Sequence, residues 1–396
     1  MNIFSTSFDY QSRLNKIRKL MDERDMDAIL VHLWPNQYYI SGMYPHLPWY
    51  PLEIAPPTES PLILFRDRGK DPVYMCYYLT SNALKEATWI KDLRVVDIKP
   101  MGKLSWWEYT AEVLREKGVD SGTIGIEKDA CVLSTFEKLK SVLPKAQFKA
   151  ADEIFQLARS VKDPDEIKLI KEAVLIAEAG LKAGMEFAKV GVLESDIQQT
   201  AEMEMKRRGA IREFETMVQS GTRTANYRAM GANWKRVEEN DLVAIDIGCI
   251  YKGYCSDITR TWSVGKPTAA QKKITRDVAA INDELLAFMK PGVTFREIAQ
   301  FGKKEVEKAG YLTDRTIPPS DENGIGEVTL HGVGLGPFQD VPYAWDWAKD
   351  FSLEIGMVIS VTVGVRYATS TIRFEDNLVM TPAGPEVMNK LIPWQL

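Results

Sequence analysis

The feature that most constrains this chain is an internal repeat in its second half. FAKVGVLESDIQQTAEMEMKRRG at 187–209 resembles FMKPGVTFREIAQFGKKEVEKAG at 288–310, with matching positions 101 residues apart. Each copy predicts a helix end, a glycine turn and a second helix, followed by a segment typical of paired strands, at 241–262 and 357–381. The repeat predicts two pseudosymmetric α+β halves that share one core, and a site at their junction would draw residues from both halves.

The residues before the repeat have a different pattern. Helix-like and strand-like pieces alternate from 10 to 150, which predicts an α/β domain. A proline- and aromatic-rich stretch at 41–60 interrupts them as a long loop. The sequence DPDE at 163–166 has an N-cap acid, a proline at the first helical position and a capping-box glutamate. We therefore expect two domains, 1–158 and 159–396.

Composition excludes some classes of partner. The formal net charge is -5 and the charges form no long runs, so nucleic acid and anionic membranes are not expected as main partners. The chain contains no run of about 18 apolar residues, so no membrane span is predicted. The start of the chain also lacks the apolar segment of a signal peptide. The four cysteines have no metal-binding spacing, which favours free thiols and a cytoplasmic location.

Two carboxylates stand out in the strand-like segment IDIGCIYKGYCSDITRTW at 245–262, namely Asp246 and Asp257. Lys-Gly at 252–253 suits a tight hairpin turn, which places Asp246 opposite Thr259 and Asp257 diagonally across on the same face. Diagonal neighbours are about 7–8 Å apart, close enough for both acids to contact one ion. Two ionised acids in a half-buried sheet repel each other, and a cation would remove that repulsion. The alternative is a pair of solvent-facing acids beside a turn.

The second half contains further candidate ligands. Glu375 lies in the apolar stretch STIRFEDNLV and corresponds in role to Asp257, whereas Thr362 stands where a counterpart of Asp246 is expected. His331, in TLHGVGLGPFQ, lies between the two acidic hairpins, although a lone histidine is more often structural. Two Asp, one Glu and one His form a set of hard oxygen and nitrogen donors that suits Mn, Fe, Co or Zn.

These motifs together resemble the creatinase/prolidase/methionine-aminopeptidase superfamily, whose catalytic domain is the pita-bread fold. The resemblance covers the whole chain, which would then be a creatinase-type α/β N-terminal domain followed by an α+β pita-bread domain. It rests on the Asp pair, HGVGLG, EIGMVISV at 354–361 and IRFED. The resemblance implies one or two divalent metal ions, with Asp257 and Glu375 as bridging ligands. The implied metal ligands are Asp246, Asp257, His331 and Glu375, and the implied catalytic residues are His331, Asp257 and Glu375.

The chain also departs from the pattern of the peptidases in this superfamily. Thr362 replaces a glutamate ligand, which puts occupancy of the His331 side in doubt and favours a single ion on Asp246, Asp257 and Glu375. Phe338 occupies the position of a second histidine, and the loop QSGTRTANYRAM at 219–230 lacks another one. That loop partly resembles the dimethylsulfoniopropionate lyase branch. Creatinase itself uses no metal, but it needs a histidine that this chain lacks at that position.

Candidate substrate-binding residues are less well defined. Arg223 and Arg373 could pair with a substrate carboxylate or be structural ion-pair residues. Aromatic side chains could cage a cationic group, although ordinary packing is the favoured interpretation. The aromatic candidates are Trp49, Tyr50, Tyr227 and Phe338. In relatives with this N-terminal domain, the domain often reaches the active site of the partner subunit, so we expect a homodimer.

The sequence therefore predicts a metal-dependent hydrolase or lyase that acts on a small polar substrate, cationic or carboxylate-bearing. We expect that it is not a true Xaa-Pro peptidase. Three alternatives stay open: an Xaa-Pro dipeptidase or aminopeptidase P-like metallopeptidase, a dimethylsulfoniopropionate-type C–S lyase, and a catalytically inactive pita-bread binding module.

Overall fold

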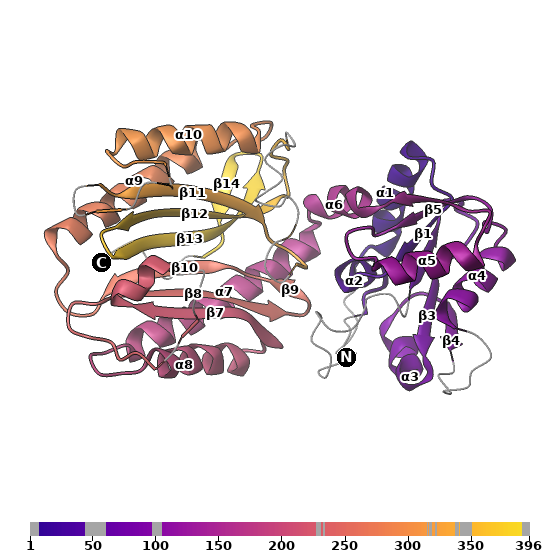
Figure 1. Cartoon of the computed structure of the whole chain (residues 1–396), viewed down its shortest axis with the longest axis horizontal. Helices are drawn as coiled ribbons and strands as arrows, with labels where there is room; N and C mark the ends of the chain where they lie inside the picture. Colours follow the sequence, from indigo (N-terminus) through magenta and orange to yellow (C-terminus); the bar gives the residue numbers. More distant parts are fainter. Residues whose placement is uncertain are drawn as a thin grey trace. The chain divides into compact units, whose positions relative to one another are not determined.

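The computed structural model of this chain separates into two compact units, residues 1–159 and 160–396 (Figure 1). The structure describes residues 8–43, 61–96, 105–226, 231–232, 234–314, 316, 319–320, 323–336, 340 and 351–389. None of the helices among these residues is both long and apolar enough to cross a membrane.

The first unit is an α/β domain built on a six-stranded mixed sheet with the order β4-β3-β2-β1-β5-β6. Its elements are α1 (Tyr10–Glu23), β1 (Ala28–Val31), α2 (Trp34–Ser41), β2 (Leu62–Phe65), β3 (Val73–Tyr77), α3 (Tyr78–Ala87), β4 (Asp92–Val96), α4 (Trp106–Glu116), β5 (Thr123–Ile126), α5 (Leu133–Val142), β6 (Gln147–Ala150) and α6 (Asp152–Ser160). Strand β1 pairs parallel with β5 and antiparallel with β2, and all four of its residues are buried.

The second unit is built on a larger sheet whose strands follow the order β11-β12-β13-β10-β8-β7, with β14 paired to β13 and β9 to β8. Its elements are α7 (Pro164–Phe187), α8 (Glu194–Arg207), β7 (Arg212–Ser220), the 3-10 helix η1 (Gly221–Asn226), β8 (Leu242–Tyr251), β9 (Tyr254–Cys255), β10 (Ile258–Ser263), α9 (Ala269–Phe288), α10 (Phe295–Lys308), β11 (Ile325–Gly332), β12 (Val358–Tyr367), β13 (Ser370–Thr381) and β14 (Gly384–Val387).

The two copies of the sequence repeat have matching elements in this unit. Helices α8 and α10 begin 101 residues apart and also end 101 residues apart, as do the C-terminal ends of α7 and α9. Each copy turns at a glycine in the left-handed region, Gly191 with a φ of 88° and Gly292 with a φ of 93°. The two halves join where β10 pairs with β13, so one sheet runs through both of them.

The predicted register of the first hairpin is also confirmed. Asp246 on β8 faces Thr259 on β10. The hairpin turns at Lys252 and Gly253, whose φ angles are 47° and 88°. Two consecutive positive φ angles are typical of the tight hairpin turn that the Lys-Gly pair predicts. The second hairpin, β12–β13, places Thr362 opposite Glu375 in the same way.

The two faces of the large sheet differ in polarity, because side chains alternate along each strand. One face is apolar, and in the second half Val361, Val363 and Phe374 pack there against Ile281 and Leu285 of α9. The other face carries polar side chains from both halves, including those of Asp246, Thr259 and Glu375. The candidate site lies on this polar face.

Candidate metal centre

Three buried side chains converge on the polar face, namely Asp257, His331 and Glu375, and we call them the metal cluster. The Nε2 atom of His331 lies 3.5 Å from Oδ2 of Asp257 and 3.4 Å from Oε1 of Glu375. Each residue comes from a different place in the fold: Asp257 directly precedes β10, His331 lies on β11 and Glu375 lies on β13. The cluster therefore exists only when both halves of the repeat are folded together.

The orientation of His331 suits a metal ligand. Its Nδ1 lies 3.0 Å from the carbonyl oxygen of Gly332. With Nδ1 donating to this carbonyl, Nε2 faces the two carboxylates, which would accept a proton from it in the metal-free protein, and a bound ion would take the place of that proton. A neutral imidazole held in this way is the form that binds a metal ion.

Glu375 is fixed by hydroxyl groups on both of its oxygens. Ser360 donates to Oε1 at 2.6 Å and Thr259 donates to Oε2 at 3.0 Å. Burial by itself would raise the pKa of Glu375, but hydrogen bonding to His331 and the charge of Arg373 outweigh burial and lower the pKa to about 2. Glu375 is therefore ionised at neutral pH and available as an anionic ligand.

Asp257 is positioned through its backbone. Its N–H donates to Oδ1 of Asn377 at 2.9 Å, and Nδ2 of Asn377 donates to its carbonyl oxygen at 2.7 Å. Asn377 in turn donates its own N–H to the side chain of Asn389 at 3.2 Å. This clamp joins β10 to β13 directly beside the cluster, and it fixes the carboxylate of Asp257 near His331.

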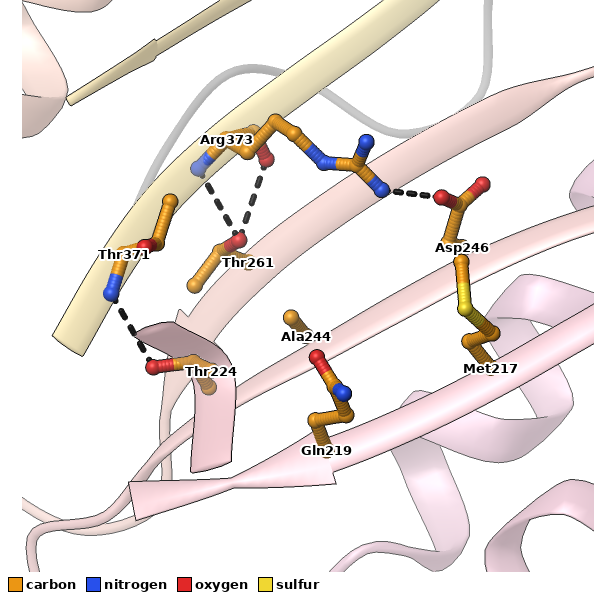
Figure 2. Close-up of a pocket in the computed structure, with 8 residues that line it drawn as sticks. All are labelled: Met217, Gln219, Thr224, Ala244, Asp246, Thr261, Thr371 and Arg373. Carbon is orange, nitrogen blue, oxygen red and sulfur yellow. Dashed lines mark hydrogen bonds and ion pairs between the residues drawn. The ribbon is translucent and has the colours of Figure 1, made fainter. Parts of the chain in front are cut away.

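Asp246 lies on the same polar face and is paired with an arginine. Its carboxylate forms an ion pair with the guanidinium of Arg373, which Figure 2 shows reaching across from β13. Burial raises the pKa of Asp246, and the charge of Arg373 offsets part of this effect. The three side chains that the structure brings together are on the His331 side, whereas the predicted single ion would have used Asp246, Asp257 and Glu375. Arg373 is the charged partner of Asp246 in this structure, and the role of Asp246 as a metal ligand stays a prediction.

Arg223 is not among the side chains of the metal cluster. Arg223 pairs with Glu194, with Nε to Oε2 at 3.0 Å, and its Nη2 donates to the carbonyl oxygen of Gly231 at 2.7 Å. Arg223 and Arg373 are thus both ion-pair residues, which is the second of the two interpretations offered for them. The aromatic candidates Trp49, Tyr50, Tyr227 and Phe338 lie outside the described residues.

Sequence reasoning missed the residues that hold the ligands in place. Ser360 and Thr259 bind Glu375, and Asn377 binds Asp257. On the opposite face of the sheet, Arg260 forms a buried ion pair with Asp376 at 2.5 Å and donates to the carbonyl oxygen of Glu375 at 2.9 Å. The alternation along β13 could have indicated Asn377, because it lies two residues from Glu375 and shares its face.

The cluster fits a divalent metal ion. One nitrogen and two carboxylate oxygens, one from each residue, lie within 4.8 Å of one another. Ligands on a single ion, each about 2.0–2.2 Å from it, are separated by distances of this order after a small adjustment. The donor set is hard and suits Mn, Fe, Co or Zn.

Comparison with known proteins agrees with this architecture. Residues 168–382 match the model of metallopeptidase family M24, and residues 13–161 match the creatinase/prolidase N-terminal domain. An Xaa-Pro dipeptidase from Pyrococcus horikoshii is 28% identical over 96% of this chain and 97% of its own length. An uncharacterized peptidase, YqhT, from Bacillus subtilis is 30% identical over 94% of this chain and 96% of its own length. The solved prolidase from Pyrococcus furiosus has a TM-score of 0.77 and 28% identity, covering 95% of this chain and 100% of that chain.

Fold and cluster together define a peptidase-like metal-dependent hydrolase with a creatinase-type N-terminal domain. The chain belongs to metallopeptidase family M24. The predicted pita-bread fold is confirmed. The expectation of a non-peptidase finds no support among these relatives, and the Xaa-Pro dipeptidase alternative fits them better. None of the relatives named above is a lyase, so the resemblance to the lyase branch stays unsupported.

Proposed function

We propose that this chain is a metal-dependent hydrolase of dipeptide-sized substrates, with Xaa-Pro dipeptides as the substrate class. The observation that carries the proposal is the cluster, in which Nε2 of His331 faces the carboxylates of Asp257 and Glu375 at 3.5 and 3.4 Å. Relatives named Xaa-Pro dipeptidase that align over nearly the whole chain support this choice of substrate.

The residues have separate roles in this proposal. Asp257, His331 and Glu375 hold the ion, while Ser360 and Thr259 keep the Glu375 carboxylate in position. A bound divalent ion supplies Lewis-acid chemistry, polarising a substrate carbonyl and lowering the pKa of water. Burial of the cluster keeps bulk water from competing with these charges.

We further propose that each chain binds a single ion, on the His331 side. The carboxylate of Asp246 is already paired with Arg373, and Thr362, which faces Glu375, offers no carboxylate. Three protein ligands with open positions for water and substrate are typical of catalytic sites of this kind.

Metal analysis combined with peptide hydrolysis tests the proposal. Protein stripped with a chelator and reloaded with Mn²⁺ is expected to bind about one ion per chain and to release proline from Xaa-Pro dipeptides. The variant Asp257→Asn is expected to lose both properties, because it removes one of three ligands. Asp283→Asn, which changes an exposed acid on α9, serves as the matched control and is expected to keep both.

Each other outcome has a defined meaning. Protein that neither binds Mn²⁺ nor releases proline would be a binding module rather than an enzyme. Protein that binds Mn²⁺ but cleaves no dipeptide would refute the peptidase assignment and return the substrate search to other small polar compounds, including sulfonium and guanidino acids.

The homodimer and the cytoplasmic location also belong to this proposal. The location is supported by four cysteines without a disulfide, Cys76, Cys131, Cys249 and Cys255. The dimer follows from the resemblance of the N-terminal domain to the creatinase type. Light scattering of the purified protein distinguishes a dimer from a monomer by mass.

A further inference from the structure

A buried ion pair contacts the loop at 332–336 that follows His331, which we call the glycine loop. Nζ of Lys162 lies 4.0 Å from Oδ2 of Asp340, and both side chains are only 1% exposed. Lysine and aspartate are rarely buried so completely, because each charge gives up its hydration. A buried ion pair is often no more stabilising than apolar side chains of the same size. What the pair holds in place is therefore more informative than the stability it contributes.

Asp340 holds the glycine loop at two points. Its Oδ2 accepts from the N–H of Leu335 at 2.9 Å, and its own N–H donates to the carbonyl oxygen of Gly332 at 2.9 Å. Gly334, between these two points, has no room for a side chain. A Cβ there would collide with Oδ2 of Asp340 and would lie 3.1 Å from Cε of Lys162. The glycine loop thus packs directly onto the ion pair.

Lys162 is itself fixed to the start of β12. Its N–H donates to the carbonyl oxygen of Gly356 at 3.0 Å, and the preceding residue, Val161, forms a β-bridge with Met357. The Nζ atom of Lys162 also donates to the carbonyl oxygen of Ser160 at 3.3 Å. Because β12 belongs to the large sheet, the ammonium group has a fixed position relative to the strands that carry the metal cluster.

The carbonyl group of Gly332 connects the ion pair to the imidazole of His331. It accepts from the N–H of Asp340 at 2.9 Å and lies 3.0 Å from Nδ1 of His331. The N–H of Asp340 limits the directions in which this carbonyl can point, and the carbonyl in turn sets the direction of the imidazole. Partners of this kind orient a histidine ligand, and their loss typically lowers metal affinity by about tenfold to a hundredfold.

A second contact of the glycine loop reaches the segment that leads to Asp257. The carbonyl oxygen of Gly334 accepts from the N–H of Cys255 at 2.8 Å, two residues before Asp257. The glycine loop therefore contacts the segments of two ligands, His331 and Asp257, whose facing atoms are 3.5 Å apart. Glu375 is held separately, by hydroxyl groups on the neighbouring strands.

We propose that Lys162 and Asp340 are positioning residues for the metal cluster, which direct Nε2 of His331 and set its distance to Asp257 through the glycine loop. The proposal rests on the proposed function only in that the cluster binds a metal ion, and it is independent of the substrate. Removing the charge of Lys162 takes a cation away from a carboxylate that stays buried. That carboxylate is then expected to move toward water and to carry the glycine loop with it.

The Mn²⁺ affinity of Lys162→Met tests this role, because methionine keeps the length of the side chain and removes the charge. We expect the dissociation constant for Mn²⁺, measured by competition with a coloured chelator, to rise by about tenfold to a hundredfold. Leu285→Ala is the matched control, since it removes buried apolar volume from α9 on the opposite face of the sheet. The control is expected to lower the free energy of unfolding and to leave the dissociation constant unchanged.

A charge-neutral pair gives a second test. Asp340→Asn keeps an oxygen that can accept from the N–H of Leu335, but it leaves the ammonium group of Lys162 buried without that carboxylate. This variant is therefore expected to weaken Mn²⁺ binding as well. The double variant Lys162→Met/Asp340→Asn removes both charges and is expected to bind Mn²⁺ more tightly than Lys162→Met alone. Losses that simply add in the double variant would overturn the proposal.

The histidine rings give a readout that needs no bound metal. The chain has only three histidines, so the ring nitrogen signals of His331 can be assigned by NMR of histidine-labelled protein from their loss in His331→Asn. In metal-free protein, Lys162→Met is expected to shift these signals, because the hydrogen bond between Nδ1 and Gly332 changes. Leu285→Ala is expected to leave them in place.

These measurements separate the positioning role from the proposed function. Wild-type protein that binds no Mn²⁺ would refute the proposed function, and the His331 signals of Lys162→Met would then decide on the positioning role. Unshifted signals would refute that role, and so would an Mn²⁺ affinity that is unchanged in Lys162→Met or lowered equally in Leu285→Ala. If Lys162→Met does not fold, Asp340→Asn is compared with Leu285→Ala by the same two measurements.

Discussion

Replacing Arg373 with methionine separates an ion-pair role of Asp246 from a metal-ligand role. The guanidinium pairs with Asp246, and its Nη1 lies 4.0 Å from Oε2 of Glu375. The side chains of Arg373 and Asp246 are only 9% and 16% exposed. Removing one partner of a buried pair typically costs about 3–5 kcal/mol, because the other charge stays buried without compensation. We expect Arg373→Met to lower the free energy of unfolding by about this amount in chelator-treated protein.

The free energy of unfolding that Arg373→Met loses is expected to depend on whether Mn²⁺ is present. A divalent ion on the cluster supplies positive charge close to the carboxylates that Arg373 leaves behind, so saturating Mn²⁺ is expected to recover part of the lost stability. Arg260→Met is the matched control. Arg260 forms a similarly buried pair with Asp376 on the opposite face of the sheet, with exposures of 3% and 1%. Arg260→Met is expected to lower the free energy of unfolding by as much as Arg373→Met does. Mn²⁺ is not expected to recover any of that loss.

Urea unfolding of both variants, with chelator and with Mn²⁺, measures these values. Equal recovery of the two variants by Mn²⁺ would show that the metal stabilises the fold in general and not the carboxylates beside Arg373. If Arg373→Met has nearly the same free energy of unfolding as the wild type in the presence of chelator, the ion pair does not stabilise the fold. Loss of Mn²⁺ binding in Asp246→Asn would identify Asp246 as a ligand after all.

Two other predictions follow from single residues. Thr362→Glu places a carboxylate opposite Glu375. We expect this variant to bind Mn²⁺ more tightly by roughly tenfold to a hundredfold, the range that changes at a metal site commonly produce. Competition with a coloured chelator measures the affinity for Mn²⁺, and an unchanged affinity would contradict the prediction. In the first unit, burial raises the pKa of Glu127 from 4.5 to about 7, although hydrogen bonds from Asn36 and the N–H groups of Leu33 and His32 oppose the shift. Glu127 therefore holds its proton more tightly in the folded state than in the unfolded state. Its contribution to the free energy of unfolding is full below pH 4.5 and is lost as the pH rises through about 7. The total loss is about 3 kcal/mol. Glu127→Gln is expected to remove this pH dependence in urea unfolding between pH 5 and 8, and an unchanged slope would argue against it.

The sequence was informative wherever a local signal fixed the geometry. The Lys-Gly turn at 252–253 determines which residues of β8 and β10 face each other, so the position of Asp246 opposite Thr259 could be predicted. The repeat fixed the helix boundaries, because the same glycine turn follows the same helix end in both copies. His331 and Glu375 could be identified from their motifs.

The pairing of β10 with β13 could not be read from the sequence. These strands belong to different halves, and no turn connects them, so their register depends on how the halves dock. That register brings Arg373 within reach of Asp246 and sets Asn377 beside Asp257. The ion pair and the clamp therefore became visible only in the three-dimensional structure.

The charges on the polar face give an independent reason for one ion rather than two. Asp246, Asp257 and Glu375 carry three negative charges when ionised, and Arg373 carries one positive charge. One divalent ion neutralises the two negative charges that remain, whereas a second ion would leave an excess of positive charge on a mostly buried face, which is costly. Counting from the two hairpin turns, 252–253 and 368–369, shows where this balance arises, because Arg373 stands at the position equivalent to Asp257. In the second half, a positive side chain thus stands where the first half has a ligand of the proposed ion, and this charge is what reduces the requirement from two ions to one.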